Sequence, residues 1–459
     1  MAEMVKYSVE PTVGQPEGFK MTELGPLPEE WEVARLKEIA KFTKRPKGLV
    51  LGKQIAFVPM ELIPDDASIK PGCRLIRPNE LKSGTYCEPG DVLVARITPC
   101  FENGKQAIVP DDHRVVWFTS TEVFPLKANP QFIERNFLFY YLRLPDVRQE
   151  IAAKMEGTTG RQRIPKQVFA NHLVPLPPLS EQRAIAHVLR TVQRAKEATE
   201  RVIQATQELK KSLMRYLFTY GPVPVEEAER VPLKETEIGL VPEHWEVVKL
   251  ENCLSLIRNG ISKKQNATSK TGYPVTRIET ISEDRINPDK VGYIDNLTPT
   301  EVEKFSLRPG DILFSHINSE PQIGRSVIYE GWPSTLLHGM NLLLLRTNSN
   351  TIPYWLNYLF MHYRAIGIFI KIAARAVNQS SINQSKMKSL PIPLPPLPEQ
   401  HEIARILQAV DKKLQAEEAR KQALEALFKT LLNNLMTGKI RVKDVVLPNV
   451  GEGKGDVTH

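Results

Sequence analysis

A long stretch without proline or glycine constrains the fold of this chain more than any other feature. Neither residue occurs between Pro178 and Gly221. Because proline and glycine are the usual helix breakers, their absence predicts one long helix, for which Ser180 offers a side-chain oxygen as N-cap. At 1.5 Å per residue, a helix of about 40 residues is about 60 Å long. The prolines just before it predict an extended segment.

Apolar and small residues recur along this predicted helix at alternating steps of three and four. Arginine, lysine, glutamate and glutamine fill the remaining faces. Such spacing is typical of a helix that packs lengthwise against another helix. The predicted coiled-coil seam consists of Ile185, Val188, Val192, Ala195, Thr199, Val202, Thr206, Leu209, Leu213 and Tyr216.

The motifs around this helix occur a second time in the chain. Residues 175–182 read PLPPLSEQ and residues 393–400 read PLPPLPEQ, an offset of 218. Residues 22–31 read TELGPLPEEW and residues 236–245 read TEIGLVPEHW, an offset of 214, while Pro-Gly-Asp at 89–91 returns at 309–311, an offset of 220. A second helix is predicted after residue 400, with an apolar stripe of Ile403, Leu407, Val410, Leu414, Leu424, Phe428, Leu431 and Leu435. The chain is therefore a tandem duplication of a globular region followed by a long helix.

This duplication predicts how the chain divides into parts. We predict a flexible N-terminal lead (1–21), a first globular domain (22–174), a hinge with the first long helix (175–221), a linker (222–235), a second globular domain (236–392), a hinge with the second long helix (393–438) and a C-terminal tail (439–459). Segments rich in β-branched residues alternate with turn residues in both globular domains. Helical spacing also occurs at 131–144 and 353–370, so each domain is predicted to be α+β.

The order of these motifs resembles that of the specificity subunit of type I restriction-modification systems, over about residues 20–440. The resemblance implies two mixed α/β target recognition domains, separated by two long helices that form an antiparallel coiled coil, with an internal pseudo-two-fold repeat. It also implies that the two domains lie at opposite ends of the helices and read a bipartite, asymmetric target in double-stranded DNA.

The same resemblance implies partners. Two modification (methyltransferase) subunits would bring S-adenosylmethionine and adenine-N6 methylation, and translocating restriction subunits would bring ATP- and Mg²⁺-dependent cleavage. For this chain we expect no cofactor, no metal and no catalytic residue. It would supply the DNA address and the assembly surface of the complex, within host defence against foreign DNA.

Catalytic motifs were sought in the sequence and do not occur. There is no N/D-P-P-Y/F loop of an adenine methyltransferase and no GxxxxGK[ST] phosphate loop. Asp65-Asp66 and Asp111-Asp112 follow prolines as in nuclease sites, but no ExK partner stands nearby. The histidines His316, His338 and His362 are too widely spaced for a helical metal site, and are predicted to be solvated or packed. The four cysteines form no CxxC pair, which predicts reduced, buried thiols.

Composition narrows the class of protein further. Of the 459 residues, 41% are hydrophobic and 25% are charged, which excludes wholesale disorder. No uninterrupted apolar run approaches membrane-spanning length, so we expect a cytoplasmic protein with no membrane partner. The net charge of +8 is compatible with a polyanionic partner.

Basic and amide-rich segments occupy corresponding places in the two globular domains. Arg and Lys neutralise phosphates, and Arg, Asn, Gln, Ser and Thr read base edges. In the first domain the candidate DNA-binding residues are Lys44, Arg45, Lys47, Arg96, Thr98, Asn103, Lys105, Thr158, Thr159, Arg161 and Arg163. In the second domain they are Arg258, Asn259, Lys263, Lys264, Asn318, Gln322, Arg325, Asn378, Gln379 and Ser381.

Between the shared motifs the two domains have little sequence in common, so one frame is predicted to present two different surfaces. The alternative for any one basic cluster is an ordinary solvated surface. Trp31 and Trp245 are predicted to be core anchors of the two domains rather than base-stacking platforms. A coiled-coil adaptor that does not bind DNA would explain the helices and the duplication, but not the paired basic segments.

Overall fold

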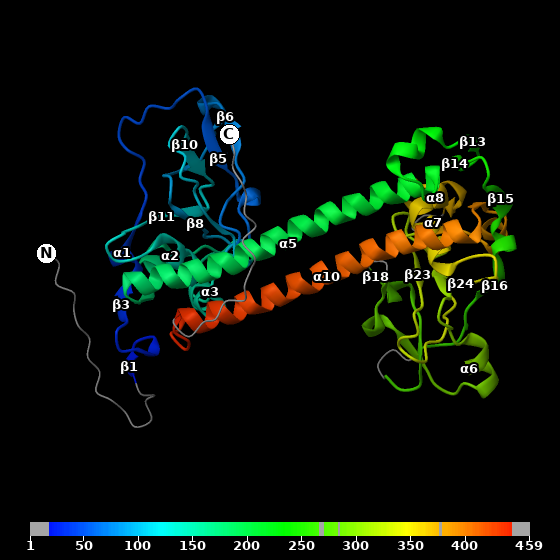
Figure 1. Cartoon of the computed structure of the whole chain (residues 1–459). Coiled ribbons are helices and arrows are strands. Elements are labelled where there is room, and N and C mark those ends of the chain that lie inside the picture. The colour runs from blue at the N-terminus through cyan, green and yellow to red at the C-terminus, as the bar shows by residue number, and fades with distance from the viewer. Residues whose placement is uncertain (1–17, 266–269, 283–284, 376–378, 443–459) are drawn as a thin grey trace. The chain divides into compact units, whose positions relative to one another are not determined.

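The structure, a computed structural model, describes residues 18–265, 270–282, 285–375 and 379–442. It divides into two compact units (Figure 1). Unit 1 contains the chain up to Arg201 and again from Glu417, and unit 2 contains Val202–Ala416. The two long helices, α5 (Leu179–Tyr220) and α10 (Leu397–Met436), each contribute to both units.

Unit 1 is built around two four-stranded sheets. The strands of the first sheet lie in the order β4 (Ala40–Phe42), β11 (Val123–Ala128), β8 (Val92–Ala95), β9 (Gln106–Ile108). Those of the second lie in the order β6 (Arg74–Ile76), β5 (Ile55–Val58), β10 (Val116–Thr119), β7 (Thr85–Cys87). Helices α2 (Arg135–Tyr141) and α3 (Pro145–Ala152) join the first sheet to the long helices through one core, which includes Phe137, Tyr140, Ile185, Leu189 and Leu431.

Unit 2 repeats the first of these sheets. Its strands lie in the order β16 (Leu254–Asn259), β24 (Leu343–Thr347), β21 (Ile312–Phe314), β23 (Ser326–Ile328). Unit 2 lacks a counterpart of the second four-stranded sheet among its described residues. Instead, β17 (Tyr273–Val275) pairs with β20 (Gly292–Ile294), and β18 (Ile281–Ser282) pairs with β19 (Arg285–Ile286). Strand β26 (Ser380–Ser381) pairs with both β22 (Ile317–Asn318) and β25 (Ala374–Arg375). The helices of this unit's globular part are α6 (Pro299–Phe305), α7 (Pro353–Ala365), α8 (Ile368–Ile372) and α9 (Gln384–Lys388).

Strand register shows which residues correspond between the repeats. In unit 1, Leu126 is paired with both Phe42 and Val92. In unit 2, Leu345 is paired with both Ile257 and Ile312. The Pro-Gly-Asp motif ends one residue before Val92 and one residue before Ile312, so the two ladders can be superposed residue by residue. The duplication predicted from the sequence is therefore confirmed at the level of individual strands.

The repeated motifs at the start and end of each globular part bind each other. The indole N–H of Trp31 donates to Glu181 at 3.1 Å, and that of Trp245 donates to Glu399 at 2.8 Å. Both tryptophans are fully buried, so their predicted role as core anchors is confirmed. The strand after each tryptophan pairs with the proline-containing strand before each long helix: β3 (Glu32–Arg35) with β12 (Leu173–Leu176), and β15 (Glu246–Lys249) with β27 (Pro391–Leu394).

The glutamine of each PLPPLxEQ motif fixes the start of the following helix. The side-chain amide of Gln182 donates to the carbonyls of Phe132 and Pro177, and its oxygen accepts the Glu134 N–H. Gln400 repeats this pattern with the carbonyls of Asn350 and Pro395 and the N–H of Ile352. Both glutamines are buried, at 0% and 1% exposure, so these hydrogen bonds satisfy groups that would otherwise be costly to bury.

The long helices run antiparallel within each unit. In unit 1, Lys196 of α5 lies 3.6 Å from Glu425 of α10, and Lys421 of α10 lies 3.0 Å from Glu200 of α5. Moving forward along α5 thus moves backward along α10. In unit 2, Lys210 binds Asp411 at 2.6 Å, ten residues beyond Glu200 on one helix and ten before Lys421 on the other. The same register therefore holds in both units.

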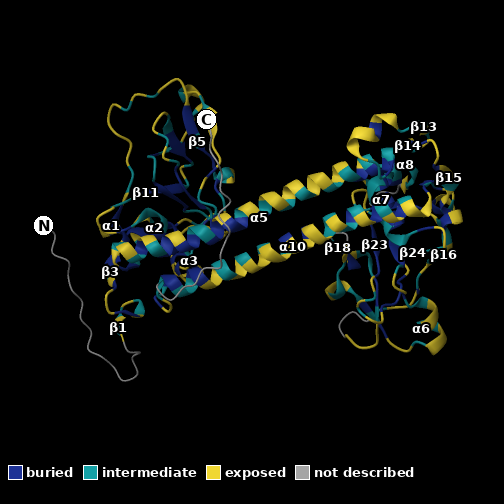
Figure 2. Cartoon of the chain, in the orientation of Figure 1, coloured by how far each residue is buried: buried dark blue, intermediate teal, exposed yellow. Residues whose placement is uncertain are grey.

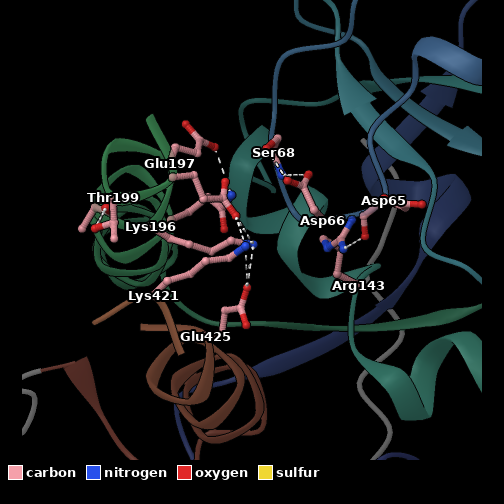
Figure 3. A network of polar contacts seen from close by, with 12 residues as sticks. Asp65, Asp66, Ser68, Arg143, Lys196, Glu197, Thr199, Lys421 and Glu425 are labelled. Carbon is pink, nitrogen blue, oxygen red and sulfur yellow. Dashed lines mark hydrogen bonds and ion pairs between the residues drawn. The ribbon is translucent and has the colours of Figure 1, made fainter. Parts of the chain in front are cut away.

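A polar network surrounds the helix pair in unit 1 (Figure 3). Lys196 and Lys421 converge on Glu425 from the two helices. On the globular part, Asp66 accepts hydrogen bonds from the Ser68 N–H and hydroxyl, both at 3.1 Å. Burial raises the pKa of Asp66, but these hydrogen bonds and the charge of Lys196 outweigh that effect, and the net pKa lies below its usual value.

Two details predicted for the first long helix are wrong. Helix α5 begins at Leu179, so Ser180 lies within its first turn and is not the N-cap. The predicted seam holds from Ile185 to Thr199 and again at Leu213 and Tyr216, which pack against the core of unit 2, but Val202 and Leu209 are 39% and 52% exposed. Between these two stretches Ile203, Thr206 and Lys210 are half-buried, and Lys210 binds Asp411. Figure 2 shows the exposed stretch that results, since no residue of α5 from 200 to 213 is buried.

Several predicted segments hold more structure than expected. The predicted lead includes part of β1 (Phe19–Thr22), which pairs with β2 (Gly25–Pro28). The predicted linker holds a 3₁₀ helix (Val225–Arg230) and most of β13 (Leu233–Thr236), which pairs with β14 (Gly239–Pro242). The predicted boundaries at 174/175 and 392/393 fall inside β12 and β27.

Other element predictions need correction in extent. The helix predicted over 131–144 is limited to α2, with α3 following it, and the one predicted over 353–370 is broken by Gly367, whose φ is +79°. Of the predicted buried thiols, Cys87 and Cys253 are buried, Cys100 is half-buried and Cys73 is exposed. Among the described residues, no helix combines the length and apolar character that crossing a membrane requires.

Candidate nucleic-acid interface

Two of the three predicted DNA-binding segments of unit 1 lie against each other. The loop between β8 and β9 carries Arg96, Thr98, Asn103 and Lys105, and a turn closed by hydrogen bonds between Glu156 and Arg163 carries Thr158, Thr159 and Arg161. An isolated β-bridge joins Ile97 to Arg163. The Thr98 N–H donates to the Gln162 carbonyl at 3.0 Å, and the Ile164 N–H donates to the Arg96 carbonyl at 2.8 Å.

A single carboxylate fixes two of the predicted arginines. Arg163 donates to Glu122 from Nε at 3.0 Å and from a terminal nitrogen at 2.7 Å, and Arg96 Nε lies 3.3 Å from the same group. The hydrogen bonds from Arg163, followed by the charges of both arginines, lower the pKa of Glu122. The charges of Arg96 and Arg163 together exceed that of Glu122, so this group of three side chains carries a net positive charge. Thr158, Thr159 and Arg161 are exposed in the adjoining turn.

The other predicted residues of unit 1 differ in whether they reach the surface. Lys44, Arg45 and Lys47 lie exposed in the loop after β4, where the Arg45 guanidinium is 5.8 Å from the Phe118 ring centre. Lys105 points inward and donates to the carbonyls of Met60 and Ile63, both at 3.0 Å. Thr98 donates to Glu102 at 2.7 Å, and the exposed Asn103 belongs to the tight turn after Pro99.

Unit 2 joins the corresponding segments in the same way. Strands β22 and β26 pair Ile317 with Ser381, and the Ile382 N–H donates to the His316 carbonyl at 2.8 Å. These contacts repeat Ile97 with Arg163, and Ile164 with Arg96, at offsets of 218 to 220. The structure therefore places Asn318 opposite Ser380, next to Gln379 and Ser381, while Gln322 and Arg325 lie in and just after the turn that follows β22. Asn378 was also predicted and lies outside the described residues.

The other predicted residues of unit 2 are held by local partners. Arg258 donates to the Lys304 carbonyl and lies 5.3 Å from the Phe305 ring centre. Asn259 accepts a hydrogen bond from Gln384 at 2.8 Å. Lys263 binds Glu301 at 2.7 Å, which lowers the pKa of that carboxyl to about 2, while Lys264 is exposed. Asn318 donates to the Ser315 hydroxyl at 3.0 Å.

Sequence reasoning missed residues that shape this interface. Glu122 holds Arg96 and Arg163, yet it stands alone in a turn and carries no motif. Lys41 and Lys166 line a groove beside Lys44 but come from β4 and from α4 (Lys166–Ala170), far apart in sequence. Only the fold brings them together, so a single sequence gave no signal for them.

Possible metal ligands are dispersed among the residues that the structure describes. No cluster of three or more histidine, cysteine, aspartate or glutamate side chains is placed to hold a metal ion in that part of the chain. His338 is fully buried and donates to the Leu342 carbonyl at 2.8 Å, and burial lowers its pKa to about 4. Burial also lowers the pKa of His316 and that of His362, the latter to about 4. These histidines are packed neutral side chains, as predicted.

Comparison with known proteins agrees with the duplicated geometry. The sequence model of the type I restriction modification DNA specificity domain matches residues 28–210 and again residues 242–426. The chain belongs to this family. It carries the specificity domain twice, and each match spans one globular part and most of the long helix that follows it.

Two proteins similar in sequence to this chain are specificity subunits by name. A putative type I restriction enzyme MjaX specificity subunit from Methanocaldococcus jannaschii is 50% identical over 221 residues, which cover 48% of this chain and 52% of that protein. The MjaVIII specificity subunit of the same organism is 25% identical over 450 residues, covering 94% of this chain and 97% of that one. In fold, the chain is similar to the S subunit of a type I system from M. genitalium, with a TM-score of 0.55, 14% identity and coverage of 88% and 96%.

Proposed function

We propose that this chain is the subunit that gives a type I restriction-modification complex its DNA sequence specificity. Each unit reads one half of a bipartite, asymmetric duplex target. The observation that carries the proposal is the pair of loop assemblies, joined by the same backbone contacts in both units but lined by different side chains. One frame that presents two chemically different surfaces fits two unlike half-sites.

The chemistry of such a complex belongs to its partners. Modification subunits bring S-adenosylmethionine for adenine-N6 methylation, and restriction subunits bring ATP- and Mg²⁺-dependent cleavage. In this proposal the chain itself brings neither cofactor nor catalytic residue. Its long helices, with their exposed middle stretch, offer the surface on which the partners assemble (Figure 2).

The decisive experiment maps methylated adenines. The chain is expressed with its modification subunit in cells that lack other adenine methyltransferases, and the methylated positions are read from genomic DNA. We expect one bipartite sequence with two unlike halves and an unread spacer of constant length. Methylation without sequence preference, or no methylation together with no salt-dependent binding to duplex DNA, contradicts the proposal and favours an adaptor that does not bind DNA.

The helices test the spacer separately from the half-sites. Deletion of residues 202–208 from α5 together with 413–419 from α10 keeps both the Glu200–Lys421 and the Lys210–Asp411 pairs in register. Each deletion shortens its helix by about 10 Å with a rotation of only about 20°. We expect the methylated target to keep both half-sites and to change its spacer. The single deletion of 202–208 breaks the register and should abolish methylation; altered half-site sequences in the matched double deletion would contradict this division of roles.

A further inference from the structure

An open groove of about 770 Å³ lies beside the predicted DNA-binding loops of unit 1. Its walls come from α1 (Leu36–Ile39), β4, the loop after β4, and α4. Its charged lining residues are Lys37, Lys41, Lys44, Lys127, Lys166 and Glu88. Glu88 is occupied by Lys127, so the other four lysines have no carboxylate partner among the described residues. The groove therefore carries a concentrated positive charge.

Aromatic rings connect this groove to the reading loops. The Lys166 ammonium lies 4.4 Å from the Phe42 ring centre, and Phe42 makes an edge contact with Phe124 at 5.1 Å. The Arg96 guanidinium lies 5.3 Å from the centre of that same Phe124 ring. The row of rings holds the two cations in place by cation–π attraction. The positive charge thus continues from the Arg96 loop to the groove.

Three of the groove lysines are replaced by uncharged residues at the corresponding positions of unit 2. By strand register, Lys41 opposite Lys127 corresponds to Leu256 opposite Arg346. Two residues after the corresponding pair Phe42 and Ile257 stand Lys44, in the loop after β4, and Asn259, the last residue of β16. The shared contacts of Ile164 and Ile382 place Gln384 at the position of Lys166. Where Lys44 and Lys166 both line the groove of unit 1, their counterparts in unit 2 are joined by a Gln384–Asn259 hydrogen bond of 2.8 Å.

We propose that this lysine groove, found in unit 1 and not repeated in the described part of unit 2, binds the phosphate backbone of the DNA without reading its sequence. The inference rests on the proposed function and adds an unequal division of labour to it: the first unit anchors the duplex and reads it, whereas the second mainly reads. Lysine ammonium groups are compact point charges that suit phosphates and make poor bidentate contacts to bases. Their spread over α1, β4, the loop after β4 and α4 fits an extended polyanion rather than a single small anion.

The test measures how binding of the full-length chain to a random-sequence duplex depends on salt. The variant is Lys41→Gln with Lys166→Gln, and the matched control is Lys70→Gln with Lys82→Gln, which removes the same charge from exposed lysines that do not line the groove. Each phosphate contact contributes about 0.9 to the slope of log K against log salt. We expect the groove variant to lose about 2 from that slope and to bind roughly tenfold more weakly near 100 mM salt, with its thermal unfolding unchanged.

A gain-of-function variant tests the same idea from unit 2. Asn259→Lys with Gln384→Lys recreates the lysine pair there and should increase the slope. If the wild-type chain shows no salt-dependent binding to duplex DNA, the proposed function itself fails. If the wild type binds but the groove variant keeps its slope, or the control loses as much as the groove variant, only the groove assignment is overturned.

Discussion

The buried aspartate that opens the central strand is satisfied differently in the two repeats. Asp91 and Asp311 each end a Pro-Gly-Asp motif and are 0% and 1% exposed. Asp311 accepts two hydrogen bonds from Arg346, at 2.7 and 2.8 Å. At the corresponding position of unit 1, Lys127 pairs with Glu88 instead. Burial therefore raises the pKa of Asp91 to about 6. The hydrogen bond that Asp91 accepts from the Glu88 N–H, at 2.8 Å, lowers this pKa but does not offset burial.

The interior beneath the reading loop differs as well. In unit 1, Arg143 donates to the carbonyls of Gly104 and Asp65, and five residues later the buried Arg148 donates to the Phe101 carbonyl and to Gln106. In unit 2, Arg364 likewise donates to a loop carbonyl, that of Pro321.

Five residues after Arg364, however, stands Phe369, whose ring packs on Phe314 with 4.9 Å between ring centres. Pro321 stands 220 residues after Phe101, so Arg364 binds the loop carbonyl that corresponds to the one bound by Arg148. The comparison teaches that both repeats tie this loop to the helix behind it through an arginine, whereas the second arginine of unit 1 and the aromatic contact of unit 2 are particular to each repeat.

The largest expected effect concerns what the repeats share. Trp31→Ala and Trp245→Ala each remove a fully buried indole and leave Glu181 or Glu399 without its donor. We expect each to destabilise its own unit by about 3–5 kcal/mol. Hydrogen exchange of the β8 amides for unit 1 and the β21 amides for unit 2 measures this.

The conservative variants Trp31→Phe and Trp245→Phe keep most of the buried ring and serve as controls, with smaller losses expected. Equal loss of protection in both units after one substitution would show that the repeats do not unfold as separate bodies. If the two alanine variants differ by several kcal/mol in their loss of unfolding free energy, the two tryptophans do not play equivalent roles in the two repeats.

The shared frame was largely predictable from the sequence, because it is written in repeated local motifs. The long helices, the tryptophan anchors and the strands after each Pro-Gly-Asp follow from residue type and spacing. The exposure of Val202 and Leu209 on α5 was not predictable, since the half-buried Lys210 binds Asp411, which lies 201 residues away in the sequence. Similarly, β13 forms in a segment with linker composition because β14 pairs with it.

The candidate site was predictable only in outline. The repeat offsets indicated which segments correspond between the two domains, as the shared contacts of Ile164 and Ile382 show, but not that these segments lie against the Arg96 loop and its counterpart. They did not reveal that Lys105 points inward to two carbonyls, or that Glu122 collects Arg96 and Arg163. These contacts depend on strand register and on helix placement, which vary between the repeats and which no short motif encodes.

A smaller effect should separate the repeats at their central aspartates. Asp311→Asn leaves Arg346 without a carboxylate, and we expect unit 2 to lose about 2–4 kcal/mol, less than a fully buried pair would cost because Arg346 is partly exposed. The double variant Asp311→Asn with Arg346→Met serves as the control, since it removes both charges of the ion pair and leaves neither one unpaired. A loss as large in the double variant as in the single one would show that the ion pair is not what the aspartate contributes.

The smallest effect, and one of opposite sign, is expected for Asp91→Asn. The folded pKa of Asp91, about 6, exceeds its unfolded value near 3.8, so the folded state holds a proton that the unfolded state has released. The wild-type unit 1 therefore loses stability as pH rises from about 4 to 6, by up to about 3 kcal/mol, and the cost remains at higher pH. Asparagine cannot ionise and still accepts the Glu88 N–H through its amide oxygen.

We therefore expect Asp91→Asn to match the wild type near pH 4 and to exceed it by about 1–2 kcal/mol at pH 8, since the amide NH₂ group must also be buried and offsets part of the gain. Hydrogen exchange of the β8 amides across this pH range measures the difference. Asp311→Asn, measured alongside, should be destabilising at both pH values. If Asp91→Asn is destabilising at pH 8, the buried carboxylate of the first repeat has a stabilising partner after all, and the two repeats treat their central aspartates alike.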